Sequence, residues 1–203
     1  MKFTDGNWLI REKYEVNNPI EVRDYEIKDN ELTLFTPDKE INHRSDTISS
    51  PLYTIKISSP GEDIIKVKFE HFKGVQDLGP HFELQELEKA NSVIKEEESE
   101  LIFKSGDLSV VIDKENYSLK FYNEDELLTE SGFKNTAYIK NKENDRRYVR
   151  EQLNLAVGEN IYGLGERFTP YVKNGQVVDI WNRDGGTSSE QAYKNIPFYV
   201  SNQ

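Results

Sequence analysis

Cysteine is absent from the chain, and this absence limits the chemistry that it can carry. A chain without cysteine has no disulfide framework and no thiolate ligand for a metal, and its three histidines are too scattered to form a zinc cluster. No stretch approaches the ~20 apolar residues of a membrane-spanning helix, and the first residues lack the apolar segment of a signal peptide. We therefore expect a soluble, cytoplasmic protein without a metal or other cofactor.

Positive charge is also scarce. The chain has 26 Lys and Arg residues against 37 Asp and Glu residues, which gives a formal net charge of -11 and a pI near 4.9. Binding to a polyanion requires a clustered positive field. The composition therefore argues against nucleic acids and anionic membranes as partners.

Alanine, the strongest helix former, occurs only four times, whereas tyrosine occurs eleven times and phenylalanine ten times. At 203 residues the chain lies in the range in which all-β sandwiches form a single domain. We predict one domain over residues 1–203 with an all-β fold, a mostly antiparallel β-sandwich with few short helical turns and no helix longer than two or three turns.

Apolar and polar residues alternate with a period of two over residues 53–57 and 65–69, on either side of a turn at 59–62. This pattern is typical of a half-buried antiparallel sheet. The strands that we predict cover residues 7–10, 19–27, 32–35, 53–57, 65–69, a short stretch near 93–94, and a meander from 101 to 121. Asp29 and Asn30 are expected to form the turn of a first hairpin, which leads from 19–27 into 32–35. A short helical turn is expected at 83–90. The residues expected to be buried are Ile65, Val67, Phe69, Leu108, Val110 and Ile112.

The last residues, 198–203, form an apparent strand that has no turn or cap after it. Natural domains rarely end inside a strand pattern. We therefore expect the chain to be a fragment of a longer protein.

The stretch from Trp181 to Tyr199 has neither the apolar period of a helix nor that of a strand, so core packing does not explain it. Gly185 and Gly186 allow positive φ angles and a close approach to another surface, and Asp184 before them presents a carboxylate. This pattern favours a ligand-facing loop. The alternative is that Asp184 is an ordinary turn residue that hydrogen-bonds to its own backbone.

Two other glycines, Gly163 and Gly165, could be mistaken for a phosphate-binding loop. The segment lacks the third glycine of the dinucleotide fingerprint and the Gly-Lys-Ser/Thr of a P-loop. The two glycines instead predict a bulge or a close backbone approach.

His71 and His81 flank Asp77, so a histidine and a carboxylate could act as an acid/base pair of the kind used in sugar epimerisation. Acidic residues are so abundant here that such a pairing is expected by chance. Trp8 and Trp181 are interpreted as core or interface residues in preference to sugar platforms.

Three segments near the C-terminal end, residues 162–168, 181–187 and 190–199, together resemble glycoside hydrolase family 31. The likeness is greatest to the bacterial α-xylosidase branch. Residues 5–10, 70–72 and 79–81 are similar to the same branch, so the resemblance covers essentially the whole chain.

This resemblance implies a galactose-mutarotase-like N-terminal domain, or supersandwich, that precedes a catalytic (β/α)8 barrel. In the family, two barrel aspartates carry out retaining hydrolysis through a glycosyl-enzyme intermediate, so the chain itself is expected to hold no catalytic residue. The family aspartate that contacts the sugar in the leaving-group subsite falls on Asp184. The sequence assigns no role to the neighbouring Arg183 and Thr187.

The resemblance also implies partners. These are α-xylosides or xylosylated oligosaccharides bound by the full-length enzyme, and the enzyme's own barrel. A homo-oligomer is expected as well, on separate grounds. A domain separated from its barrel is expected to expose Tyr193, Ile196, Phe198 and Tyr199 and to self-associate through them. The alternatives are a free-standing carbohydrate-binding module, a domain that mediates oligomer assembly, and the N-terminal domain of a related α-glucosidase.

Overall fold

The computed structural model describes residues 2–6, 8–71, 90–181 and 194–203. The chain divides into two compact units. The larger unit comprises Glu12–Asn154, and the smaller unit comprises Met1–Arg11 together with Leu155–Gln203. The expectation of a single domain over residues 1–203 stays a prediction.

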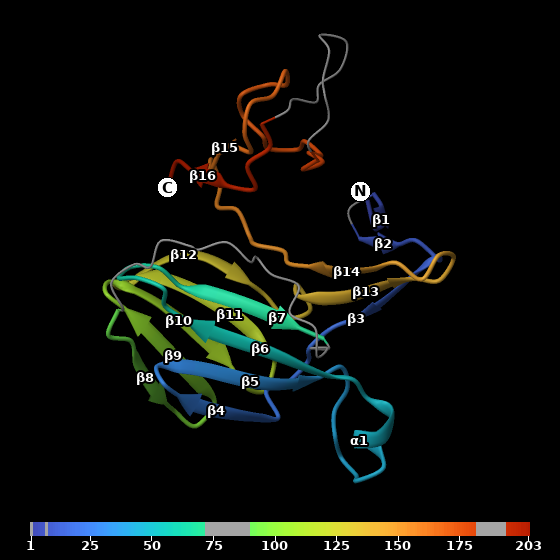
Figure 1. Cartoon of the computed structure of the whole chain (residues 1–203), viewed down its shortest axis with the longest axis vertical. Coiled ribbons are helices and arrows are strands. Elements are labelled where there is room, and N and C mark those ends of the chain that lie inside the picture. The colour runs from blue at the N-terminus through green and yellow to red at the C-terminus, as the bar shows by residue number, and fades with distance from the viewer. Residues whose placement is uncertain (1, 7, 72–89, 182–193) are drawn as a thin grey trace. The chain divides into compact units, whose positions relative to one another are not determined.

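The described part of the larger unit forms three antiparallel sheets (Figure 1). A four-stranded sheet has the order β4 (Asp24–Lys28), β5 (Glu31–Pro37), β6 (Leu52–Ser58) and β7 (Lys66–Glu70). A five-stranded sheet has the order β12 (Glu126–Ser131), β11 (Ser118–Asn123), β10 (Leu108–Asp113), β9 (Glu100–Ser105) and β8 (Val93–Glu96). A three-stranded sheet joins β14 (Arg147–Arg150), β13 (Ala137–Asn141) and β3 (Tyr14–Asn17).

The core lies between the four-stranded and the five-stranded sheet. In the first sheet Leu32 pairs with Ile57, and in the second Val110 pairs with Phe103, so that apolar residues in register occupy the inner face of each sheet. The buried members of this cluster are Leu32, Leu34, Ile55, Ile57, Leu101, Phe103, Val110, Ile112, Tyr117 and Leu119. Full burial of one such side chain is worth about 1.5–3 kcal/mol. The two sheets therefore form a sandwich, as the period-two pattern predicts.

The first predicted hairpin is confirmed. Asp29 and Asn30 have φ angles of 51° and 63°, and the turn that they form joins β4 to β5. Two successive positive φ angles are typical of the type I′ turn, whose twist matches that of the flanking strands. The short strand expected near residues 93–94 is also confirmed, as β8.

The burial predicted for six residues is confirmed for only some of them. Val110 and Ile112 are fully buried, and Leu108, Ile65 and Phe69 are half-buried. The prediction for Val67 was wrong, because its side chain is 37% exposed. The reason is that β7 lies at the edge of the four-stranded sheet, where neighbours cover it on one side.

The strand predicted over 19–27 begins later than expected, since β4 starts at Asp24. The preceding residues form backbone hydrogen bonds to two different segments. Ile20 N donates to Pro37 O at 3.0 Å, next to the end of β5, whereas Val22 N donates to Lys114 O at 2.8 Å, in the turn after β10. A segment that divides its hydrogen bonds in this way does not belong to a single ladder.

The all-β prediction is confirmed for the described residues, in which the only helix is α1 (Asp46–Ser49). The predicted helical turn at 83–90 falls almost entirely outside the described residues. No helix in the described ranges combines the length and the apolar character needed to span a membrane.

In the smaller unit, the residues that the structure describes form two short antiparallel strand pairs. One joins β1 (Thr4–Asp5) to β2 (Leu9–Ile10), and the other joins β15 (Ile161–Gly163) to β16 (Tyr199–Ser201). The buried carboxylate of Glu159 accepts hydrogen bonds from Ser201 Oγ at 2.6 Å and from Ala156 N at 2.7 Å. This carboxylate therefore links the start of β15 to the last described strand.

Candidate functional site

Asp184, the predicted site residue, lies outside the described residues, together with Arg183, Thr187 and Tyr193. The segment that contains them, residues 182–193, is flanked by Trp181 and Lys194. The described residues that hold these two flanks determine where the segment begins and ends in the smaller unit.

A backbone ladder holds the C-terminal flank in place. Beyond the paired strands β15 and β16, Leu164 N donates to Phe198 O at 2.8 Å and Glu166 N donates to Lys194 O at 3.0 Å. Residues 161–166 therefore run alongside residues 194–201.

This close pairing depends on two glycines. Gly163 has a φ angle of 107°, and a Cβ placed on it would lie 2.8 Å from Phe198 O. Gly165 has a φ angle of 86°, and its Cβ would lie 2.1 Å from Lys194 O. Both contacts are shorter than a side chain tolerates, and both φ angles are unfavourable for other residues. The predicted close backbone approach is thus confirmed.

Arg167 and Asn195 join the two flanks of residues 182–193. The Arg167 guanidinium donates from Nη2 to Asp179 O at 2.6 Å and to Asn195 Oδ1, and from Nε to Leu164 O at 3.3 Å. Asn195 in turn donates from Nδ2 to Trp181 O at 2.7 Å. We call Leu164, Arg167, Asp179, Trp181 and Asn195 the loop base. The sequence assigns Arg167 no role of its own, because only tertiary contact brings its carbonyl and amide partners together.

Apolar side chains next to the loop base are exposed. Ile196, Phe198 and Tyr199 have exposed fractions of 53%, 64% and 46%, which confirms the predicted exposure for these three residues. Trp8 and Trp181 are exposed as well, so the interpretation of either as a core residue was wrong. An interface role remains a prediction for both tryptophans.

His71 is the one described member of the proposed histidine and carboxylate pair, since Asp77 and His81 lie outside the described residues. The His71 ring centroid is 4.0 Å from that of Tyr138 and 5.7 Å from that of Tyr53. Burial and, secondarily, the positive charge of Arg147 lower the pKa of His71. The ring is therefore held in its neutral form at neutral pH, packed among aromatic residues.

Comparison with known proteins extends this description. The model of the glycosyl hydrolase 31 N-terminal galactose mutarotase-like domain matches residues 54–203. The α-xylosidase XylQ of Lactiplantibacillus pentosus is 46% identical over 202 residues, which cover 99% of this chain and 26% of that protein. An α-xylosidase of Emericella nidulans is 38% identical over 221 residues, which cover 99% of this chain and 28% of that protein.

The chain thus spans about a quarter of the length of these two curated relatives. A more distant relative, α-glucosidase 2 of Bacillus thermoamyloliquefaciens, is 24% identical over 152 residues, or 72% of this chain and 19% of that protein.

Solved structures share the fold. The GH31 dextranase of Flavobacterium johnsoniae superposes with a TM-score of 0.69 at 20% identity, over 91% of this chain and 21% of the dextranase. A GH31 α-xylosidase from a soil metagenome, complexed with xylose, superposes with a TM-score of 0.63 at 17% identity, over 88% of this chain and 26% of that enzyme.

Proposed function

Because the chain belongs to the family of glycosyl hydrolase 31 N-terminal galactose mutarotase-like domains, we propose that it is the non-catalytic N-terminal domain of a retaining α-xylosidase. The parent enzyme would remove terminal non-reducing α-xylosyl residues. The observation that carries this proposal is the 46% identity to an α-xylosidase along 99% of the chain. A cytoplasmic location, expected from the sequence, is part of the same proposal.

In this proposal the chemistry belongs to a barrel that follows residue 203. Retaining hydrolysis requires a nucleophilic carboxylate and an acid/base carboxylate about 5 Å apart on either side of the glycosidic bond. The domain would supply neither group, and its own contribution would be binding. A purified 203-residue chain is accordingly expected to show no turnover of an aryl α-xyloside.

The contribution that we propose for the domain is Asp184, whose carboxylate would accept hydrogen bonds from hydroxyls of the leaving-group sugar. The loop base supports this role, because Arg167 and Asn195 join the two flanks of the segment that carries Asp184. A binding loop whose ends are fixed loses less conformational entropy when a ligand binds. A hydrogen bond to a charged group is worth about 1.5–3 kcal/mol.

The exposed residues Ile196, Phe198 and Tyr199 are proposed to pack against the barrel of the parent enzyme. Exposed apolar clusters of this kind mark surfaces that a partner covers. The same surface would allow homo-oligomers to form when the barrel is absent.

A related α-glucosidase is the second candidate for the parent enzyme, and the 24% identity to a Bacillus α-glucosidase favours it. The two candidates differ in the sugar that the barrel accepts at the non-reducing end. Parallel assays of the parent enzyme with aryl α-xylosides and aryl α-glucosides would distinguish them.

The test of the proposal is Asp184→Ala in the parent enzyme. We expect kcat/KM for a xylosyl disaccharide to fall by about one to two decades, in line with the free energy of one charged hydrogen bond. An aryl α-xyloside has a better leaving group and depends less on binding in the leaving-group subsite, so its kcat/KM should fall less. Asp125→Ala, in the turn between β11 and β12, serves as a control and should leave both substrates unaffected. Equal losses for the two substrates would refute the role of Asp184.

A further inference from the structure

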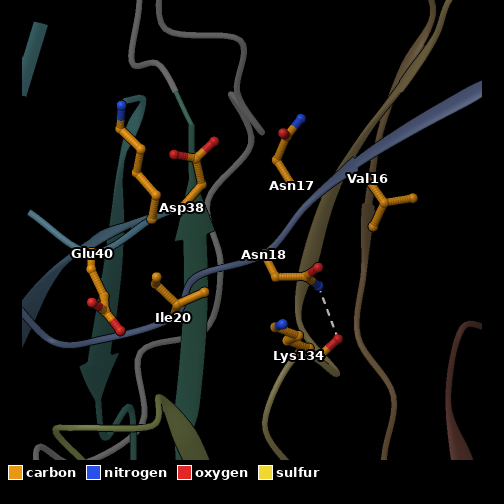
Figure 2. Close-up of a pocket in the computed structure, with 8 residues that line it drawn as sticks. Val16, Asn17, Asn18, Ile20, Asp38, Glu40 and Lys134 are labelled. Carbon is orange, nitrogen blue, oxygen red and sulfur yellow. Dashed lines mark hydrogen bonds between the residues drawn. The ribbon is translucent and has the colours of Figure 1, made fainter. Parts of the chain in front are cut away.

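A hollow of about 590 Å³ lies in the larger unit, where three separate segments converge. These are the end of β3 with the residues just after it, the residues just after β5, and the loop before β13. Figure 2 shows the carboxylate of Asp38 and the amide of Asn17 in the upper part of the view, with Ile20 and Asn18 below them. The volume falls within the range of about 300–1,000 Å³ that is typical of small-ligand sites.

Two hydrogen-bond acceptors in this hollow are held in place by the protein. Ser50 Oγ donates to Asp38 Oδ1 at 2.6 Å, and among the described residues Asp38 Oδ2 has no hydrogen-bond donor. Asn18 Nδ2 donates to Lys134 O at 2.9 Å and to Thr136 O at 2.8 Å, which fixes the amide plane and commits both of its N–H groups. Its Oδ1 thus remains as an acceptor with a set orientation.

Two lysines supply hydrogen-bond donors. Lys39 Nζ donates to Ser49 Oγ at 2.6 Å and keeps two further N–H groups, since an ammonium has three. Lys134 Nζ lies 5.0 Å from the centroid of the Phe133 ring. The positive charges of Lys39 and Lys134 balance the negative charges of Asp38 and Glu40, so the lining has no formal net charge.

The hollow also has an apolar part, formed by Val16 and Ile20. An apolar surface beside fixed acceptors and ammonium donors suits a ligand that has both C–H faces and hydroxyl groups. The balanced charge argues against an anion, which Asp38 and Glu40 would repel, and equally against a cation, which the two lysines would repel.

We propose that this hollow binds a neutral carbohydrate of one or two sugar units. The hydroxyls would donate to Asp38 Oδ2 and Asn18 Oδ1 and accept from the two lysines, while a C–H face would rest on Val16 and Ile20. The site uses described residues of the larger unit and does not include Asp184. It therefore does not depend on the function proposed above for that residue.

The test titrates the 203-residue chain with xylose, glucose and cellobiose, with glucuronate as the charged counterpart of glucose. We expect at least one neutral sugar to bind with Kd in the millimolar range, and glucuronate to bind at least about tenfold more weakly. In nuclear magnetic resonance spectra, the amide signals of Asn17, Asn18, Lys39 and Glu40 should shift during the titration. This mapping requires no variant, so it tests the proposal even if a substitution impairs folding.

Two variants complete the test. Asp38→Ala should weaken binding of the neutral sugar about tenfold or more, because it removes a charged acceptor. The matched control Asp125→Ala should bind as the unmodified chain does. Signal shifts confined to residues flanking 182–193 would assign the sugar to that loop and overturn the proposal. Absence of binding by all the neutral sugars, or equal binding of glucose and glucuronate, would also overturn it.

Discussion

Asn195 donates a hydrogen bond of 2.7 Å from Nδ2 to the carbonyl oxygen of Trp181, and this bond joins the residues on either side of 182–193. Glu166 and Lys194 also lie at this point, linked by a backbone hydrogen bond of 3.0 Å and by an ion pair of 3.0 Å. Both side chains of the ion pair are exposed, so its contribution is at most about 1 kcal/mol. The amide and backbone hydrogen bonds therefore hold the two flanks together more than this exposed ion pair does.

The first prediction separates these contributions in the parent enzyme. Asn195→Ala removes the hydrogen bond to Trp181 and the acceptor for Arg167, so binding at the loop should weaken. We expect kcat/KM for a xylosyl disaccharide to fall about tenfold and that for an aryl α-xyloside to fall less. Glu166→Gln, which removes only the exposed ion pair, is the control and should change both values less than twofold. The prediction is contradicted if Glu166→Gln lowers kcat/KM for the disaccharide as much as Asn195→Ala does. The ion pair would then matter as much as the hydrogen bonds of Asn195.

The second prediction concerns the close approach at Gly165. Gly165→Ala places a Cβ 2.1 Å from Lys194 O at a φ angle of 86°, so the two backbone segments must separate. We expect the free energy of unfolding to fall by more than about 3 kcal/mol, measured by chemical denaturation.

Gly175→Ala is the matched control for that variant. Gly175 also has a positive φ angle, 73°, but a Cβ there meets nothing within 4 Å. Only the conformational cost of about 1–2 kcal/mol should then apply. Similar losses of unfolding free energy in the two variants would show that the close approach of residues 165 and 194 does not limit the stability of the fold.

The third prediction is a pH dependence that arises from His71. Burial and then Arg147 lower the pKa of this ring below its usual value of 6.5, so the folded protein favours the neutral form. The resulting stability is present above pH 6.5 and is lost as the pH falls through the lower folded-state pKa. When the pH is lowered from about 7.5 to about 5, the melting temperature of His71→Phe should therefore fall less than that of the unmodified chain.

His43→Gln controls for the replacement of a histidine as such. His43 is exposed, and its replacement should leave the fall in melting temperature unchanged. If the melting temperatures of His71→Phe and of the unmodified chain fall equally, His71 does not contribute to acid destabilisation.

The fourth prediction concerns association of the isolated chain. Phe198 is 64% exposed next to Ile196 and Tyr199, so a second copy can cover this apolar surface. We expect the 203-residue chain to self-associate in sedimentation velocity experiments as its concentration rises, and Phe198→Ser to reduce this association. Ile48→Ser, on the exposed helix α1, is the control and should associate like the unmodified chain. A strict monomer at all concentrations would refute the prediction.

The sequence alone determined the features that depend on neighbouring residues. The alternation of apolar and polar residues predicted the inner faces of the sandwich, because successive side chains of a strand point to opposite faces. Asp29 and Asn30 predicted the first hairpin, since both tolerate the positive φ angles of its turn. Gly163 and Gly165 predicted a close backbone approach, although not the segment that approaches them.

Only the tertiary structure decided which residues meet across the chain. Val67 alternates as a core residue does, yet its place on an edge strand leaves it exposed, and strand order is not encoded in local alternation. Asn195 contacts Trp181 across the segment 182–193. Likewise, one hollow is lined by Asn18, Asp38 and Lys134, which lie far apart in sequence. No local pattern marks such contacts, because they form only when separate segments pack against each other.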